Sequence, residues 1–200
     1  MQIIETRMGI TFIFVLALAW FFLRQYAKSP FQKMLQRAAQ NDPKAQYQLG
    51  MWYYTGKRVE RDFKQAFTWF ETAANNGFVR AQVALAGLYH AGEGCKKNEK
   101  KAFEWYDTAS KTGDFEARVN WAVCYLEGIG VAQDEVKGFE ILKSAADEKS
   151  PLACTLVAGL YAQGRGTAKD DKKALSYYLQ AAKQGEPIAQ KKLKEMKGQI

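Results

Sequence analysis

The sequence has few of the residues that common catalytic and metal sites require. Its 200 residues include one histidine, His90, three cysteines and four prolines. Zinc clusters and Ser-His or Cys-His arrangements would all have to use His90, which has no acidic or thiol partner at a recognisable spacing. Cys95, Cys124 and Cys154 fit neither a zinc ribbon nor a redox pair, and they are too few for a disulfide scaffold. We therefore expect no catalytic residue, no metal and no cofactor.

The composition indicates a folded chain with excess positive charge. Hydrophobic residues make up 48% of the sequence and charged residues 25%, which allows a substantial core but is too polar for a multi-span membrane protein. Lysine and arginine exceed aspartate and glutamate by 29 − 21 = 8 residues. This charge predicts electrostatic steering toward a partner with an acidic surface. Because the lysines are scattered along the chain, we expect no nucleic-acid partner, and we also expect no small-molecule substrate.

A long uncharged run lies near the N-terminus. Residues 8–23 carry no charged side chain and are flanked by Arg7 and Arg24. At about 1.5 Å per residue the run covers roughly 24 Å, slightly less than the roughly 30 Å hydrocarbon core, so flanking residues would complete the span. We predict that residues 1–28 form a membrane anchor with a transmembrane helix over about residues 8–25.

A cleaved signal peptide is the competing interpretation of this run. Ala17 and Ala19 suit a signal peptidase, but the large apolar residues 20–23 would then form the new terminus, which favours an uncleaved signal-anchor. One basic residue, Arg7, precedes the run, and four follow it within fifteen residues. The positive-inside rule then predicts a single-pass protein of the bacterial inner membrane with the rest of the chain in the cytoplasm; a periplasmic location is the alternative.

A period of 36 residues organises the rest of the chain. Columns of tyrosine, glycine and phenylalanine share the register of five equally spaced alanines. The alanines are Ala45, Ala81, Ala117, Ala153 and Ala189. In each period, apolar residues recur at i, i+3, i+4 and i+7 in two stretches, which predicts an antiparallel pair of helices.

The predicted helices have recognisable ends. Gly56 and its equivalents suit the left-handed residue that ends a first helix. The expected N-caps of the second helices are Asp62, Asn98, Asp134 and Asp170. Gln65 follows Asp62 by three residues, which predicts a capping box.

These signals divide the chain into an anchor, four repeats and two caps. Residues 29–42 match the second half of a unit, with Ser29 and Pro30 at the start of its helix. Residues 189–200 form a lysine-rich half unit of the other kind, as a solvent-facing cap requires. The four repeats cover residues 43–188, divided as 43–79, 80–115, 116–151 and 152–188.

The repeated pattern resembles a known family. Its clearest motifs are residues 125–134 (YLEGIGVAQD) and 101–105 (KAFEW). By these motifs the chain resembles the Sel1-like repeat (SLR) family, whose units are related to the tetratricopeptide repeat. The resemblance implies an all-α fold, a right-handed α/α superhelical solenoid of four helix-pair repeats with half-repeat caps, preceded here by one transmembrane helix. It also implies a protein partner, because members of this family bind other proteins.

The resemblance further implies that first helices line a concave groove. Aromatic residues present in every unit are expected to form the core, so the columns that vary between units are the predicted binding surface. Cys154 shares the polar column of Gln46. The predicted groove residues are Gln46, Gln48, Tyr54, Gln82, His90, Arg118 and Asn120.

These features predict a membrane-anchored scaffold or adaptor that binds a partner protein in the groove without catalysis. The alternative is an immunity protein that neutralises a secreted bacterial effector of the type VI kind. A third hypothesis is a cell-envelope enzyme. The sequence argues against it, because it places no pair of carboxylates at a common predicted pocket.

The third repeat departs most from the pattern. Gly138 replaces a packing alanine, and Lys149-Ser150-Pro151 replaces the closing glycine turn. In the second repeat, Cys95-Lys96-Lys97 makes the loop between the helices basic. We expect the third repeat to be the least stable of the four.

Overall fold

The computed structural model describes residues 29–197, and these residues form ten α-helices and no strand. The chain starts with α2 (Pro30–Ala39) and ends with α11 (Pro187–Lys197). The first helices of the repeats are α3 (Pro43–Thr55), α5 (Val79–Ala91), α7 (Phe115–Glu127) and α9 (Pro151–Gln163). The second helices are α4 (Phe63–Asn75), α6 (Glu99–Ser110), α8 (Glu135–Asp147) and α10 (Asp171–Lys183).

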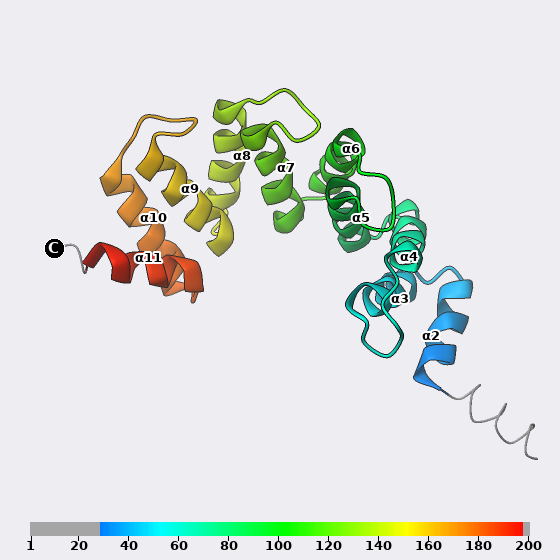
Figure 1. Cartoon of the computed structure of the whole chain (residues 1–200). Helices are drawn as coiled ribbons and strands as arrows, with labels where there is room; N and C mark the ends of the chain where they lie inside the picture. The colour runs from blue at the N-terminus through cyan, green and yellow to red at the C-terminus, as the bar shows by residue number, and fades with distance from the viewer. Residues whose placement is uncertain (1–28, 198–200) are drawn as a thin grey trace, which may run out of the picture.

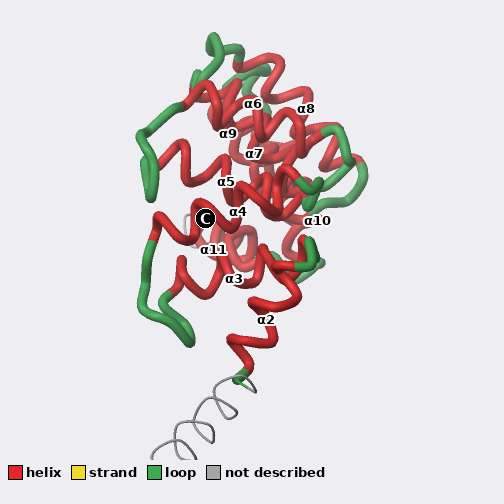
Figure 2. Tube along the Cα trace, turned by 90° about the vertical axis from the view of Figure 1, so that its right-hand side faces the viewer, coloured by secondary structure: helices red, strands yellow, loops and turns green. Residues whose placement is uncertain are grey.

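The helix pairs stack side by side into an arch that runs from α2 to α11 (Figure 1). Each helix packs mainly on its neighbours in sequence, as expected where repeats contact only adjacent repeats. Seen at 90° to this view, the connecting loops lie on the two sides of the stack, with the helices between them (Figure 2). The predicted all-α solenoid is thus confirmed over the described part of the chain.

The predicted membrane anchor, residues 1–28, lies outside the described residues. Within residues 29–197, no helix combines the length and the apolar content that crossing a membrane requires. The anchor therefore stays a prediction.

The helix ends follow the predicted residue types. The glycines that end the first helices have φ values between 70° and 75°: Gly56, Gly92, Gly128 and Gly164. At the start of α4, the Asp62 carboxylate accepts hydrogen bonds from the backbone amides of Lys64 and Gln65. The predicted capping box does not form, because the Asp62 amide donates to the Tyr53 carbonyl oxygen at 3.0 Å and needs no side-chain acceptor. The same tyrosine-to-cap bond recurs in each later repeat.

An edge-to-face aromatic pair links each repeat to the one before it. Phe67 of α4 and Tyr89 of α5 have ring centroids 5.2 Å apart, and such pairs contribute about 0.5 to 1.5 kcal/mol beyond area burial. The pair recurs as Phe103–Tyr125 and Phe139–Tyr161. Phe31 of α2 meets Tyr53 in the same edge-on way at 6.4 Å. The N-terminal cap therefore packs as the second helix of a unit.

A second glycine in the loop between paired helices sets how closely two repeats approach. Gly130 has a φ of 67°, and a Cβ there would lie 2.1 Å from the Glu99 carbonyl oxygen at the start of α6. The contact recurs between Gly94 and Phe63 and between Gly166 and Glu135. Because a side chain would collide with fixed backbone, only glycine fits. These glycines follow a helix and serve both the turn and the packing between repeats.

Two features of the third repeat account physically for its expected weakness. Gly138 lies where the other repeats have alanine, and a Cβ there would lie 2.7 Å from Leu126 and 2.9 Å from the Ala122 carbonyl oxygen. The helix thus keeps an interior glycine, which costs about 1 kcal/mol of helix propensity. Lys149 has a φ of 67° where the neighbouring repeats have glycine, a conformation that costs a non-glycine residue about 1 kcal/mol. The lower stability itself stays a prediction.

We expect Gly138→Ala to destabilise the chain by about 1 kcal/mol, because crowding by the new Cβ outweighs the gain in helix propensity. The matched variant Gly159→Ala places its Cβ 3.7 Å from the Tyr178 hydroxyl, an ordinary contact. It should stabilise the chain by about 0.5 to 1 kcal/mol. Urea unfolding of the full chain measures both changes. Equal effects of the two substitutions would contradict the packing argument.

Candidate protein-binding groove

The predicted binding column that contains Gln46 and Gln82 is buried and joins neighbouring repeats. Gln46 is 1% exposed, and its amide donates to the Ala38 carbonyl oxygen and accepts from the Asn76 side chain, at 3.1 and 2.9 Å. Gln82 is 7% exposed and donates to the Ala74 carbonyl oxygen at 3.3 Å. Each glutamine amide gives a second hydrogen bond to a carbonyl oxygen at the end of the preceding second helix, which also accepts a backbone amide from Asn41 or Gly77. Contrary to the prediction, burial leaves both side chains without access to a partner.

Arg118, in the same column, makes a different brace. Its guanidinium donates to both carboxylate oxygens of Glu148, at 2.6 and 2.8 Å. These hydrogen bonds raise the pKa of Arg118 and lower the pKa of Glu148. Cys154, predicted on a polar face, is fully buried with its thiol against the Ala146 carbonyl oxygen at 3.6 Å, so that prediction was wrong. This column therefore joins neighbouring repeats, because Gln46, Gln82 and Arg118 each form a hydrogen bond to another residue of the chain.

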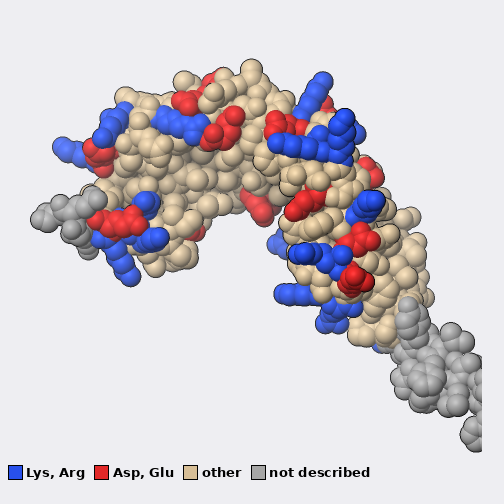
Figure 3. Space-filling model, in the orientation of Figure 1, with Lys and Arg blue, Asp and Glu red and all other residues tan. Residues whose placement is uncertain are grey.

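Two open pockets lie along the first helices, with volumes of about 300 and 290 Å³. The surface in the hollow of the arch near α7 and α9 is mostly uncharged (Figure 3). The first pocket is lined by Met51, Tyr54, Phe70, Ala84, Gly87, Leu88, Ala91 and Glu93. The second pocket is lined by Val123, Leu126, Glu127, Leu142, Thr155, Leu156, Gly159, Leu160, Gln163, Arg165, Tyr178, Ile188 and Lys192.

The two pockets are the same site, two repeats apart. Each of the eight residues lining the first has its equivalent in the second, as for Met51 and Val123, where 123 − 51 = 72 residues. Gly87 and Gly159 are equivalent, and each leaves open a space that a side chain would occupy. The fold therefore forms the same pocket twice, and the different residues that line it give the two pockets different chemistry.

Besides His90, three predicted groove residues fall in the columns that build these pockets. Tyr54 lines the first pocket directly. Gln48 and Asn120 are half-buried and share their column with Ala84 and Leu156, which line the first and second pockets. These three residues thus remain candidates for the groove, and their binding to a partner stays a prediction.

His90, near the end of α5 in the second repeat, occupies the column of Tyr54. Its Nδ1 lies 4.0 Å from the Glu99 carboxylate. The sequence argument did not single out Gly87, Glu93 or Arg165, all of which line a pocket. The sequence did contain one sign of Gly87. Glycine alternates with a larger residue in its column, which reads Met51, Gly87, Val123 and Gly159, whereas the loop glycines recur in successive units.

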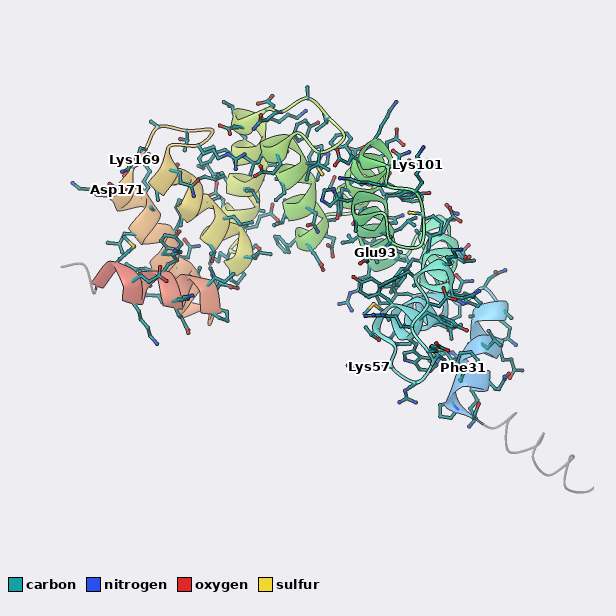
Figure 4. All side chains as sticks on the ribbon, in the orientation of Figure 1. Phe31, Lys57, Glu93, Lys101, Lys169 and Asp171 are labelled. Carbon is teal, nitrogen blue, oxygen red and sulfur yellow. The ribbon has the colours of Figure 1, made fainter. Side chains whose placement is uncertain are left out.

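Glu93 supplies the charge of the first pocket. It follows the end of α5 in the loop that leads to α6 (Figure 4). Burial raises the pKa of Tyr54, and the nearby Glu93 carboxylate raises it further. A tyrosine hydroxyl and a carboxylate therefore meet at the edge of an otherwise apolar pocket.

Arg165, at the equivalent position of the second pocket, is held by three acceptors. Its guanidinium donates to the carboxylates of Glu127 and Glu135, each at 2.7 Å, and to the Leu126 carbonyl oxygen. The hydrogen bonds with Glu127 and Glu135 raise the pKa of Arg165, and the bond from Arg165 lowers that of Glu127. Arg165 thus ties the loop of the fourth repeat to α7 and α8, and its charge is neutralised within the chain.

A further pocket lies against the second helices and has a more polar lining. Its volume is about 350 Å³, and it includes Lys101, whose ammonium nitrogen lies 5.2 Å from the centre of the Tyr89 ring. Among residues 29–197, no three His, Cys, Asp or Glu side chains are grouped so that they could hold a metal ion. The two equivalent pockets on the first helices are the candidate site.

The sequence profile of the Sel1 repeat matches residues 43–78, 79–114, 115–150 and 151–186. The crystal structure of c5321, described as a protective antigen in uropathogenic Escherichia coli strains with an SLR fold, is similar at a TM-score of 0.75 and 30% identity, covering 84% of this chain and 36% of that one. A Sel1 repeat protein from Oxalobacter formigenes gives a TM-score of 0.71 and 27% identity, covering 83% and 65%. This chain thus spans about a third of the first relative and 65% of the second.

No curated protein matches the chain. The sequence profile and the two structures agree on the repeat type, and repeats of this type generally serve as scaffolds for protein–protein interaction. The groove lined by first helices is therefore a candidate for protein binding.

We expect Arg165→Met to destabilise the chain by about 1 to 2 kcal/mol at pH 7, a modest loss because the ion pairs are partly exposed. The folded-state pKa of Glu127 is lowered, so its contribution is present above the unfolded value near 4.3 and is lost as the pH falls through the folded pKa. The difference between wild type and variant should therefore shrink at about pH 3. Urea unfolding at both pH values measures it.

The matched control for this prediction is Lys169→Met in the same loop. Lys169 lies 3.7 Å from Asp171, and both side chains are largely exposed (Figure 4). Little change in stability is expected from its loss. A Lys169 variant as destabilised as the Arg165 variant, or an Arg165 effect undiminished in acid, would refute the bracing role.

Proposed function

Because the chain belongs to the Sel1 repeat family, we propose that it is a scaffold that holds a partner polypeptide in the groove along its first helices and performs no catalysis. The observation behind this proposal is the repetition of one pocket two repeats apart on the same helices. Two hollows in register suit an elongated ligand with side chains at intervals, which is how a polypeptide presents itself to a groove.

We also propose that residues 1–28 fix this scaffold in the bacterial inner membrane, with the repeats on the cytoplasmic side. Support comes from the uncharged run of residues 8–23 and from the basic residues that follow it. The arch begins at Pro30, a few residues beyond the predicted transmembrane helix. The groove would therefore lie close to the membrane surface.

Site-specific photo-crosslinking tests the groove. A photoreactive amino acid at Ala91 or Gln163, both exposed and both lining a pocket, should give a discrete cross-linked partner in cells that express the chain naturally. The matched control is Thr68, exposed on α4 and outside both pockets. Gly87→Phe should reduce the Ala91 product and Gly159→Phe the Gln163 product at least about tenfold, because each fills its pocket.

The cross-linking results distinguish groove binding from nonspecific contact. Equal cross-linking from Thr68, or products unaffected by filling the pockets, would contradict groove binding. Thermal unfolding must show that the phenylalanine variants still fold. A toxic secreted effector as the cross-linked partner would assign the immunity role, and a resident envelope protein would assign the scaffold role.

Charge substitution tests the anchor. Leu16→Arg combined with Leu18→Arg should move the full chain from the membrane fraction to the soluble fraction, because each arginine costs about 2.5 to 3.5 kcal/mol at the centre of a membrane helix. The matched control, Leu16→Ala with Leu18→Ala, should stay in the membrane. Alkaline phosphatase fused to the C-terminus should be inactive if the repeats are cytoplasmic. A wild-type chain in the soluble fraction would contradict the anchor, and active phosphatase would place the repeats in the periplasm.

A further inference from the structure

The first pocket contains a carboxylate that forms no ion pair within residues 29–197. It belongs to Glu93, the charged residue among those lining this pocket. Glu93 is half-buried, so it is partly removed from water. A half-buried carboxylate at an open pocket is suited to receive a cation from a ligand.

The rest of the first pocket suits the stem of a long basic side chain. Met51, Tyr54 and Phe70 present apolar and aromatic surface, and Gly87 and Ala91 add little bulk. Lysine and arginine bury their methylene stems along apolar surface while their charged ends reach polar groups, and aromatic faces attract the same cations. Glu93 also lies near the Tyr54 hydroxyl, so a carboxylate and an aromatic ring stand together in the pocket lining.

The second pocket has the same shape but different chemistry. Leucines replace Tyr54, Phe70 and Ala84 at positions 126, 142 and 156. Arg165 replaces Glu93, and its charge is already paired with two carboxylates of the chain. This pocket therefore suits an apolar side chain.

The spacing of the pockets sets the spacing of the ligand's side chains. Neighbouring packed helices lie about 10 Å apart, so pockets two repeats apart lie on the order of 20 Å from each other. An extended chain advances about 3.3 Å per residue, so side chains about six residues apart would reach both pockets.

We propose that the groove binds an extended peptide segment of the partner that places a lysine or arginine side chain in the first pocket and an apolar side chain in the second, about six residues away. This proposal rests on the proposed groove function and names the partner's chemistry. It reverses the expectation from net charge, because the charge presented by the pocket is opposite to that of the whole chain.

Selection of displayed random peptides of about twelve residues, long enough to span both pockets, on the full chain in mild detergent tests the proposal. The selected peptides should combine a basic residue with an apolar residue about six positions away. Glu93→Gln, which keeps the shape of the side chain, should weaken their binding at least about tenfold. The matched control Glu140→Gln removes the same charge from an exposed position of α8 outside both pockets and should leave binding unchanged.

Charge reversal provides the second arm of the test. Glu93→Lys should abolish binding of the selected peptides, and exchange of their basic residue for glutamate should restore it. Peptides weakened by Gly87→Phe but unaffected by Glu93→Gln would overturn the basic anchor while leaving groove binding intact. If no selected peptide responds to Gly87→Phe or Gly159→Phe, the groove function itself fails.

Discussion

The separation of neighbouring repeats depends on a loop glycine that packs against a backbone carbonyl oxygen of the preceding repeat. Gly94, Gly130 and Gly166 each lie where a Cβ would approach that oxygen within 2.0 to 2.1 Å. The oxygen belongs to the first residue of a second helix, so the contact positions one repeat against the start of its neighbour's helix. Because a side chain is excluded, neighbouring repeats share one separation, and the arch results from repeating that step.

The same step explains why the two pockets are equivalent. With the backbone spacing constant, the space between neighbouring first helices depends on the side chains that face it. Gly87 and Gly159 leave that space open, and it becomes a pocket in both places. At the equivalent place between the second and third repeats, Val123 takes the position of these glycines, and His90 and Asn120 occupy the columns of Tyr54 and Ala84.

Features that depend on local sequence and period could be predicted, and features that depend on contacts between helices could not. The left-handed glycines and N-cap residues are local signals, and they led to the correct helix ends. The column of Gln46 was misread because glutamine is usually exposed, whereas here it reaches a carbonyl group eight residues earlier on the preceding helix. That column contains glutamine at Gln46, Gln82 and Gln190, and this regularity was a usable sign of a structural role. Glu93 and Arg165 share a loop column with Lys57 and Ile129, and no residue type recurs in that column to reveal them.

The contrast between Glu93 and Arg165 shows how a repeat protein gains specificity without altering its framework. The two residues are equivalent in position, but Arg165 pairs with the carboxylates of Glu127 and Glu135, whereas Glu93 pairs with no cation of the described residues 29–197. The charge of Arg165 therefore stabilises the stack and contributes little to a ligand, because bringing a second anion to a paired guanidinium gains little. The unpaired carboxylate of Glu93 can gain a partner, and desolvation in a half-buried pocket makes the charge of that partner matter. In the proposed peptide complex, electrostatic selection thus falls to the first pocket, and the second pocket, two repeats away, restricts the register of the peptide.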